Sequence, residues 1–336
     1  MNQISTIALE HRRETYAPVE RRFGDKAASR YQEVSYRAQP EENFHYRPLW
    51  DPSKEIYDED YTVLRLTDPY LYTDPRQYYY ASYVAKRSEE FEVLAKNMKF
   101  IESRQLTARL PEYWKELISR AYTPIRHWDG AAQLVSIAAS RYAWGHTISQ
   151  ALALAAFDRL GNAQAHSMVA LTISGGTTEA LDVAKANWMD NDELQPIRKY
   201  AEEAIVEPDW VAGVIAVDLI DALVAPLHFE YPEEQVLASG PTVIAILMEH
   251  FRNWYVDQKK WLDPLIKAWT QDENHGEANA KALAAIVNAR LPEAYAAAGR
   301  LADVFDELLP EKGAVEFIKA TNEAVIKRYI DLGVPL

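Results

Sequence analysis

The carboxylates and histidines of this chain are its possible metal ligands, because the sequence contains no cysteine. Helical bundles with di-iron sites take one glutamate from each of two helices and a Glu-x-x-His pair from each of two others. The residue three positions before each of the eight histidines is acidic only in Glu42–His45 and Asp272–His275. The first pair lies between two prolines and the second in the polar stretch QDENHGE, so we expect neither on a central helix.

His166 lies in an apolar, helical stretch, RLGNAQAHSMVAL. Ala163 stands where a chelating glutamate would stand, and Asn162 and Gln164 are neutral, weak metal ligands compared with carboxylates. A single neutral imidazole cannot hold two iron ions. We therefore expect a core histidine whose ring is hydrogen-bonded to a backbone carbonyl or to Asn162.

Asp218 and Asp221 lie on the apolar stretch 208–227 and are further candidate ligands. Buried carboxylates more often pair with arginine or tyrosine, so we expect such pairs here. Glu249 and Arg252 have the spacing of a ligand pair, but arginine cannot coordinate a metal. The sequence therefore predicts a charged pair in the place of a second ligand pair.

Long helices must position these side chains. The chain has only 12 glycines, and alanine and leucine recur through its second half, which favours helices. Asp74 is the expected N-cap of the first long helix, with Pro75 at its first position. Stretches 134–160 and 208–227 are apolar around much of their circumference, which indicates central helices. The expected helices cover 75–103, 110–122, 124–160, 162–187 with an interruption at Gly175–Gly176, 208–227, 241–261, 277–309 and 314–329.

This pattern predicts an all-α fold, a bundle of long helices over residues 76–336 that is preceded by an extended arm over residues 1–75. The arm is rich in proline, tyrosine and mixed charge, and it is too aromatic for a typical disordered tail. Its rings must pack on this chain's own bundle or on another subunit, and both alternatives stay open. The candidate interface residues are Phe44, Tyr46, Trp50, Tyr57, Tyr78, Tyr79 and Tyr80.

The composition excludes several classes of function. The net charge of −14 repels phosphate backbones and anionic lipid, so we expect no nucleic-acid partner and no membrane partner. No uninterrupted apolar run reaches the roughly 20 residues of a membrane-spanning helix, and the N-terminus has no apolar signal-peptide core. We therefore expect a cytoplasmic protein. Phosphate-loop, dinucleotide-binding and Gly-x-Ser-x-Gly motifs are absent.

The stretch LRLTDPYLYTDPRQYYYASYVAKRSEEFE carries a family resemblance. Together with the long arm and the apolar helices that lack a metal motif, it resembles the β subunit of bacterial multicomponent monooxygenase hydroxylases. Phenol hydroxylase is the nearest type, with toluene and methane monooxygenases as relatives. The most specific local feature is Asp74-Pro75-Arg76 followed by Tyr80 and Tyr83.

The resemblance implies a ferritin-like, non-catalytic subunit that supports a homologous catalytic α subunit, and the α subunit alone carries the di-iron centre. It also implies a small γ subunit, an (αβγ)₂ assembly, a regulatory protein and an NADH-dependent reductase. Within this chain, Asn162, Ala163 and His166 would take the place of the first ligand pair, and Glu249 and Arg252 that of the second.

Two alternatives remain open at this point. The chain could be an autonomous mononuclear-metal oxidase that uses His166 and Asp218 or Asp221 together with Glu249. It could also be a metal-free helical ligand-binding protein with no role in an assembly.

Overall fold

The computed structural model describes residues 17–24, 28–36, 38, 53, 58–233, 236 and 241–336. In this part of the chain the regular structure is helical and no strand is present, so the predicted all-α fold is confirmed. Four of the candidate interface residues, Phe44, Tyr46, Trp50 and Tyr57, lie outside the described residues. The helices are α1 (Ala17–Phe23), α2 (Arg30–Ser35), α3 (Tyr80–Ser103), α4 (Glu112–Leu117), α5 (Ile125–Tyr142), α6 (His146–Ile173), α7 (Glu179–Asp190), α8 (Gln195–Ile205), α9 (Trp210–Phe229), α11 (Thr242–Thr270), α12 (Gly276–Leu308) and α13 (Ala314–Asp331), with short 3₁₀ or π turns η1 (Glu59–Tyr61), η2 (Pro69–Leu71), η3 (Leu106–Arg109) and η4 (Ile118–Tyr122).

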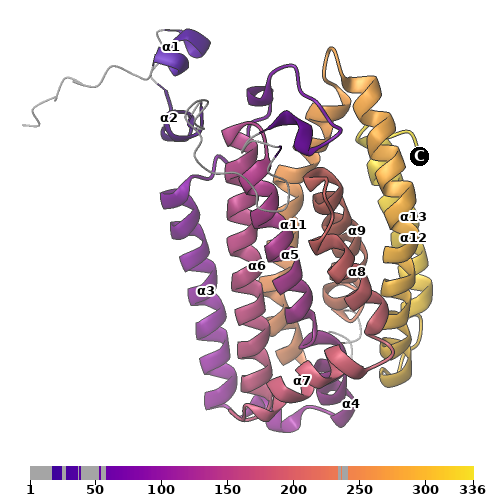
Figure 1. Cartoon of the computed structure of the whole chain (residues 1–336). Helices are drawn as coiled ribbons and strands as arrows, with labels where there is room; N and C mark the ends of the chain where they lie inside the picture. Colours follow the sequence, from indigo (N-terminus) through magenta and orange to yellow (C-terminus); the bar gives the residue numbers. More distant parts are fainter. Residues whose placement is uncertain are drawn as a thin grey trace, which may run out of the picture.

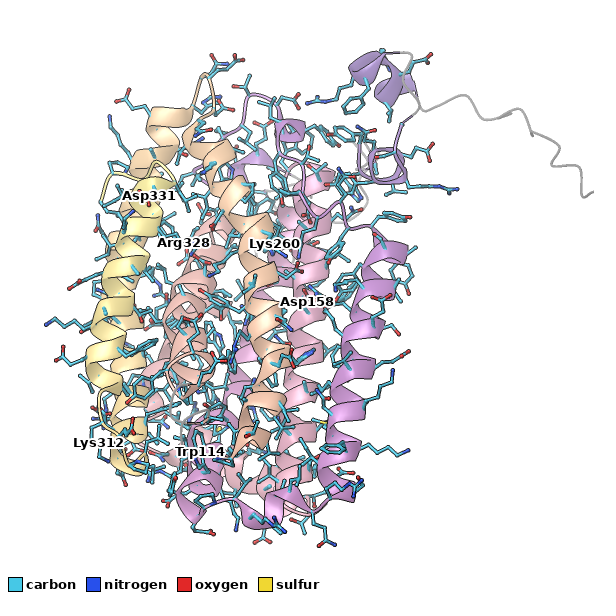
Figure 2. All side chains as sticks on the ribbon, turned by 180° about the vertical axis from the view of Figure 1, so that it is seen from behind. Trp114, Asp158, Lys260, Lys312, Arg328 and Asp331 are labelled. Atoms are coloured by element: carbon cyan, nitrogen blue, oxygen red, sulfur yellow. The ribbon has the colours of Figure 1, made fainter. Side chains whose placement is uncertain are left out.

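The long helices run side by side in one elongated bundle (Figure 1). Helix α3 forms one flank, α12 and α13 form the other, and α5, α6, α9 and α11 lie between them. Helices α4 and α7 close one end of the bundle, whereas α1, α2 and the segment 58–79 lie at the opposite end. Side chains fill the space between the long helices (Figure 2).

Helix α9 is the central helix, because every residue from Trp210 to Phe229 is buried. It begins after Asp209, whose carboxylate accepts hydrogen bonds from the backbone N–H groups of Val211 (2.8 Å) and Ala212 (3.2 Å). Among the described residues, α9 alone has the length and apolar composition to cross a membrane, and 89% of that window is buried inside the bundle. Its composition therefore matches its central position.

The predicted helix over 124–160 is interrupted, which the apolar periodicity did not indicate. Helix α5 ends at Tyr142 and α6 begins at His146, after a turn at Gly145 with a φ of +102°. A Cβ atom at this glycine would lie 2.7 Å from the Cβ of Pro69. The turn folds α5 back against α6, so residues on the two sides of it face each other. Helix α8 was also not predicted.

The predicted N-cap at Asp74 is wrong. Helix α3 begins at Tyr80 with Tyr79 in the N-cap position. Asp74 starts a turn instead: its carbonyl accepts from the N–H of Gln77 (2.9 Å), which has a φ of +52°, and its carboxylate accepts from the Arg76 side chain. The fixed φ of proline suits a tight turn as well as a first helical turn, which explains the error.

The segment 58–79 is held on this chain's own bundle by side chains at helix ends. Asp209 accepts from the backbone N–H of Val63 (2.8 Å) and Asn279 accepts from that of Arg65 (2.9 Å). Asp272, the first acidic residue of QDENHGE, accepts from the N–H of Thr67 (2.7 Å). These bonds satisfy backbone groups that have no partner in a helix or sheet.

Candidate functional site

Four helices direct side chains into one buried cluster at the centre of the bundle. Asp129 comes from α5, Arg159 and His166 from α6, and Asp221 from α9, and each of these residues is at most 4% exposed. We call these four residues the Arg159 cluster. Helix α11 closes it with aromatic rings, among them that of Trp254.

Arg159 lies between the two carboxylates. Its Nη1 donates to Asp129 Oδ1 at 3.1 Å, and its Nη2 donates to Asp221 Oδ2. The second carboxylate also accepts from Trp128 Nε1 at 2.9 Å. The ring of Trp254 lies 4.5 Å from the guanidinium carbon, a distance typical of a cation–π contact. The guanidinium is therefore paired on two sides and covered by an aromatic ring on another.

Burial dominates the ionisation of this cluster. It raises the pKa of Asp129 to about 6, although the nearby Arg159 guanidinium opposes the shift. Burial also lowers the pKa of Arg159, and the aspartates around it oppose that change. Arginine nevertheless stays protonated in proteins, so Arg159 supplies the positive charge of the cluster at neutral pH.

His166 is an uncharged packing residue in this geometry. Its ring stacks on that of Phe251, with centroids 4.0 Å apart and an angle of 19° between the ring planes. Burial holds its pKa well below the usual value. Its Nε2 lies 3.6 Å from Asp129 Oδ2, beyond hydrogen-bond distance. Within the described residues it makes no hydrogen bond to Asn162 or to a carbonyl, so that prediction was wrong. His166 and Asn162 both line a void of about 20 Å³.

The residues of the cluster do not fit a di-iron centre. Single carboxylates, Asp129 and Asp221, remain on α5 and α9, which matches half of the ligand set described for such sites. On the other two helices, α6 and α11, the i, i+3 pairs that line the same void supply no carboxylate and no imidazole. In the part of the chain that the structure describes, no group of three or more histidines and carboxylates is arranged to hold a metal ion. The two pairs are Arg159–Asn162 on α6 and Phe251–Trp254 on α11.

The predicted charged pair on α11 does not form. Glu249 is exposed, whereas Arg252 donates to Glu233 Oε1 (2.6 Å) and to the Phe229 carbonyl (3.0 Å). The α11 residues whose rings contact the Arg159 cluster are Phe251 and Trp254, two and five positions after Glu249. One residue of helix corresponds to a rotation of about 100°, so a small error in register changes which side chain points inward.

Asp218 belongs to a different group of buried charges. It accepts from Arg328 Nη1 (2.8 Å) and from the hydroxyl of Tyr329 (2.7 Å), both on α13. The expectation that the two aspartates of α9 pair with arginine or tyrosine is therefore confirmed. Figure 2 places Arg328 at the level of Lys260 along the bundle. His166 and Asp218 thus have different partners and do not form a joint metal site.

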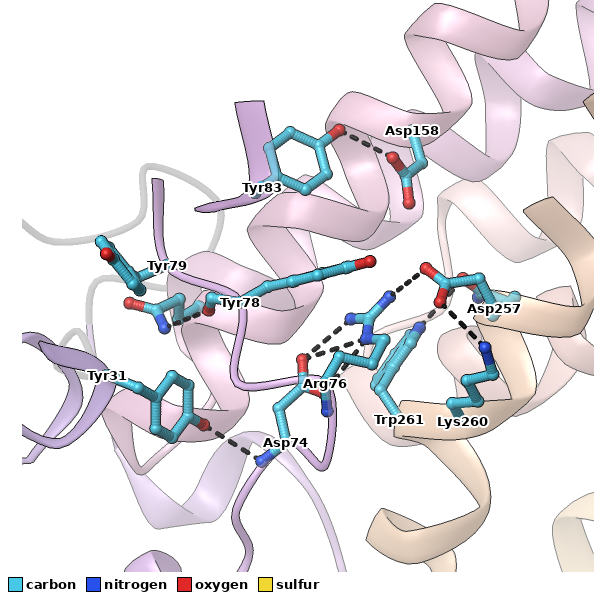
Figure 3. A network of polar contacts seen from close by, with 12 residues as sticks. Tyr31, Asp74, Arg76, Tyr78, Tyr79, Tyr83, Asp158, Asp257, Lys260 and Trp261 are labelled. Carbon is cyan, nitrogen blue, oxygen red and sulfur yellow. Dashed lines mark hydrogen bonds and ion pairs between the residues drawn. The ribbon is translucent and has the colours of Figure 1, made fainter. Parts of the chain in front are cut away.

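A third buried network was not predicted from the sequence. Arg87 on α3 donates to Asp158 Oδ1 (2.7 Å) on α6 and to Asp257 Oδ2 (2.6 Å) on α11. Arg76 reaches the same Asp257 oxygen (3.2 Å) and binds Asp74, so the turn before α3 joins the network (Figure 3). In the sequence, this network was signalled by the Asp74-Pro75-Arg76 motif of the family resemblance. The residue that Arg76 reaches on α11, Asp257, lies far along the chain from this motif.

Tyrosines surround this network. The Tyr83 hydroxyl donates to Asp158 at 2.7 Å, and the Tyr31 hydroxyl accepts from the Asp74 N–H at 3.0 Å (Figure 3). The three candidate interface tyrosines differ in their surroundings. Tyr78 lies against the Arg76 guanidinium, 4.8 Å from ring centre to carbon, and Tyr79 is half-buried. Tyr80 is 73% exposed and is the one of the three that is free to meet another surface.

Comparison with known proteins agrees with this architecture. The sequence profile of the methane/phenol/alkene hydroxylase family matches residues 50–273. The oxygenase component DmpL of phenol 2-monooxygenase from Pseudomonas sp. (strain CF600) is 37% identical over 302 residues, 90% of each chain. The crystal structure of phenol hydroxylase from Pseudomonas sp. OX1 superposes with a TM-score of 0.87, at 34% identity over 98% of each chain.

A more distant relative is the methane monooxygenase component A beta chain of Methylosinus trichosporium. It is 26% identical over 215 residues, which are 58% of this chain and 52% of that one. The resemblance noted in residues 64–92 is therefore confirmed by matches over most of the chain. On this evidence, the chain belongs to the methane/phenol/alkene hydroxylase family of multicomponent monooxygenases.

Proposed function

We propose that this chain is the non-catalytic β subunit of a cytoplasmic, phenol-type monooxygenase hydroxylase. It supports a homologous α subunit that holds the di-iron centre and hydroxylates an aromatic substrate with O₂. The assembly is (αβγ)₂, with a small γ subunit, and it works with a regulatory protein and an NADH-dependent reductase. The relatives named as oxygenase components of phenol 2-monooxygenase support the substrate class.

The observation that carries this proposal is the position of Arg159. Its guanidinium lies between the carboxylates of Asp129 on α5 and Asp221 on α9, both of which are buried. A metal cation at that position would meet a fixed positive charge in a site of low dielectric, where repulsion is strong. The chemistry of the side chains therefore disfavours iron in this chain and supports the proposal that a partner carries out the reaction.

The surface of α6 supports a partner subunit. Phe157, Leu160 and Met168 are 47%, 54% and 38% exposed on a helix whose other side holds the Arg159 cluster. Helices α3 and α5 pack against α6 and carry further exposed apolar side chains, which we group with this surface. Apolar patches of this kind mark interaction sites. We call it the α6 face; its further members are Tyr80 and Val84 on α3 and Leu134 and Ile137 on α5.

Iron analysis of separated and assembled chains tests the proposal. The full chain is produced alone and together with the catalytic subunit encoded in its source organism, and iron is measured per chain by elemental analysis. We expect iron in the assembled complex and none in this chain alone, after loading with ferrous iron under anaerobic conditions. Near-stoichiometric iron in the isolated chain would contradict the proposal.

A further inference from the structure

The Arg159 cluster has the features of a binding site for a planar cation. Two carboxylates accept hydrogen bonds from different nitrogen atoms of the guanidinium group. The ring of Trp254 covers this group at 4.5 Å. Arg159 itself is 2% exposed, so its charge is neutralised by these partners and not by water. A planar, delocalised cation suits this combination better than a compact ion, because it forms parallel hydrogen bonds and stacks on an aromatic face.

We infer that Asp129, Asp221 and Trp254 form a guanidinium-binding site that the chain fills with its own Arg159. Removal of the Arg159 side chain leaves two buried carboxylates without their cation, and a free guanidinium ion then binds in its place. The site selects a planar organic cation over a divalent metal ion, because its two carboxylates accept from two different nitrogens of one guanidinium group and the nearby His166 stacks on Phe251.

The spacing of the partners distinguishes this site from a latent metal site. The nearest imidazole nitrogen is 3.6 Å from Asp129 Oδ2, and its ring is held by the stacking contact. Besides Arg159, the polar group that contacts Asp221 is the indole N–H of Trp128. This group is a hydrogen-bond donor only, so it cannot be a metal ligand. The inference concerns this chain alone, so it stands whether or not the proposed assembly is correct.

The test is chemical rescue of the Arg159→Ala variant of the full chain. Thermal unfolding is followed while guanidinium chloride is raised from zero to about 20 mM, with sodium chloride as the ionic-strength control and cobalt chloride as the metal probe. We expect the variant to unfold about 5 °C or more below the wild type. Guanidinium should raise its Tm saturably and leave the wild-type Tm unchanged, and cobalt should have no effect.

Arg120→Ala is the matched control. Arg120 also bridges two carboxylates, those of Glu193 (2.8 Å) and Glu307 (2.9 Å), but its side chain is 19% exposed and water can replace it. We expect no saturable guanidinium response in this variant. The inference is overturned if Arg159→Ala shows no saturable response, if cobalt stabilises it as strongly as guanidinium, or if the control responds equally.

A second variant covers the case in which Arg159→Ala does not fold. This variant combines Arg159→Ala with Asp129→Asn and Asp221→Asn. The two asparagines remove the unpaired charges and keep the shape of the aspartate side chains. We expect this triple variant to fold and to ignore guanidinium, because its site carries no charge. If the triple variant also fails to fold, the role of Arg159 is packing and the inference is withdrawn.

Discussion

Arginine side chains neutralise buried carboxylates in the interior of this bundle. Arg159 serves Asp129 and Asp221, and Arg328 serves Asp218. Such pairs add little net stability compared with apolar residues of similar volume, but removal of one partner is costly because a buried charge is left alone. Each group joins helices that are distant in sequence, so these contacts fix which helices are neighbours.

The first prediction concerns His166. We expect His166→Ala to leave hydroxylation by the assembled complex largely unchanged, because the ring is uncharged and packs on Phe251. Its stability cost should be about 1–3 kcal/mol for a buried side chain with no hydrogen bond. The measurements are turnover of the complex and urea unfolding of the chain. Loss of turnover with assembly and iron content intact would refute the packing role.

The second prediction concerns acid stability. Burial lowers the pKa of His228 to about 4, although the Val224 and Ala121 carbonyls oppose the shift. Between about pH 6.5 and 4 the unfolded chain binds a proton that the folded chain does not, so stability falls as pH falls, by up to roughly 3 kcal/mol from this group. Asp129, with its pKa raised to about 6, takes up its proton first in the folded chain and partly offsets this loss.

Urea unfolding at several pH values between 7 and 4.5 checks this dependence. His228→Gln keeps a donor for the same carbonyl groups but cannot titrate, so its free energy of unfolding should fall less steeply with acid than that of the wild type. Parallel curves for the two proteins would show that another group is responsible. His250, whose pKa burial also lowers to about 4, is the next variant to measure in that case.

Helix α6 has two different sides: its inner side carries Arg159 and its outer side carries part of the α6 face. We expect Leu160→Glu to weaken association with the catalytic subunit at least about tenfold, because it places a charge in an apolar contact. Val315→Glu, at a position on α13 that is 43% exposed, is the control for an added surface charge. Sedimentation of mixed subunits measures the affinity, and equal effects of both changes would exclude α6 as the contact.

The elements themselves were largely predictable, and their mutual orientation was not. Apolar periodicity gave the long helices because it records which side of a helix is buried. It does not indicate which other helix packs on that side. Arg159 and Asp221 are 62 positions apart, and no local feature of the sequence predicts their contact. On α11, the spacing of Glu249 and Arg252 imitated a ligand pair, whereas the rings of Phe251 and Trp254 point inward.

At the scale of the whole molecule, the sequence predicts two parts. We propose that residues 1–75 act as an arm beside a bundle formed by residues 76–336. In the described part, α1 and α2 are short, and Gln150 of α6 donates to Ser35 Oγ (3.0 Å) at the end of α2.

Deletion of residues 1–50 tests the arm. We expect the truncated chain to keep most of its helix content, because the long helices lie after residue 79, and to assemble more weakly with the catalytic subunit. Circular dichroism and affinity measurements report the two effects separately. Unfolding of the truncated chain would place the arm in this subunit's own core, and unchanged affinity would remove it from the interface.

One turn of α6 holds two buried charged residues between two exposed apolar residues. Phe157 and Leu160 lie on the surface, while Asp158 and Arg159 between them are bound to α3, α5, α9 and α11 from inside. Any rotation of that turn moves both pairs together. A substitution that turns this part of α6 would displace the exposed apolar side chains and the buried ion pairs together, which couples the interior of the bundle to the shape of its surface.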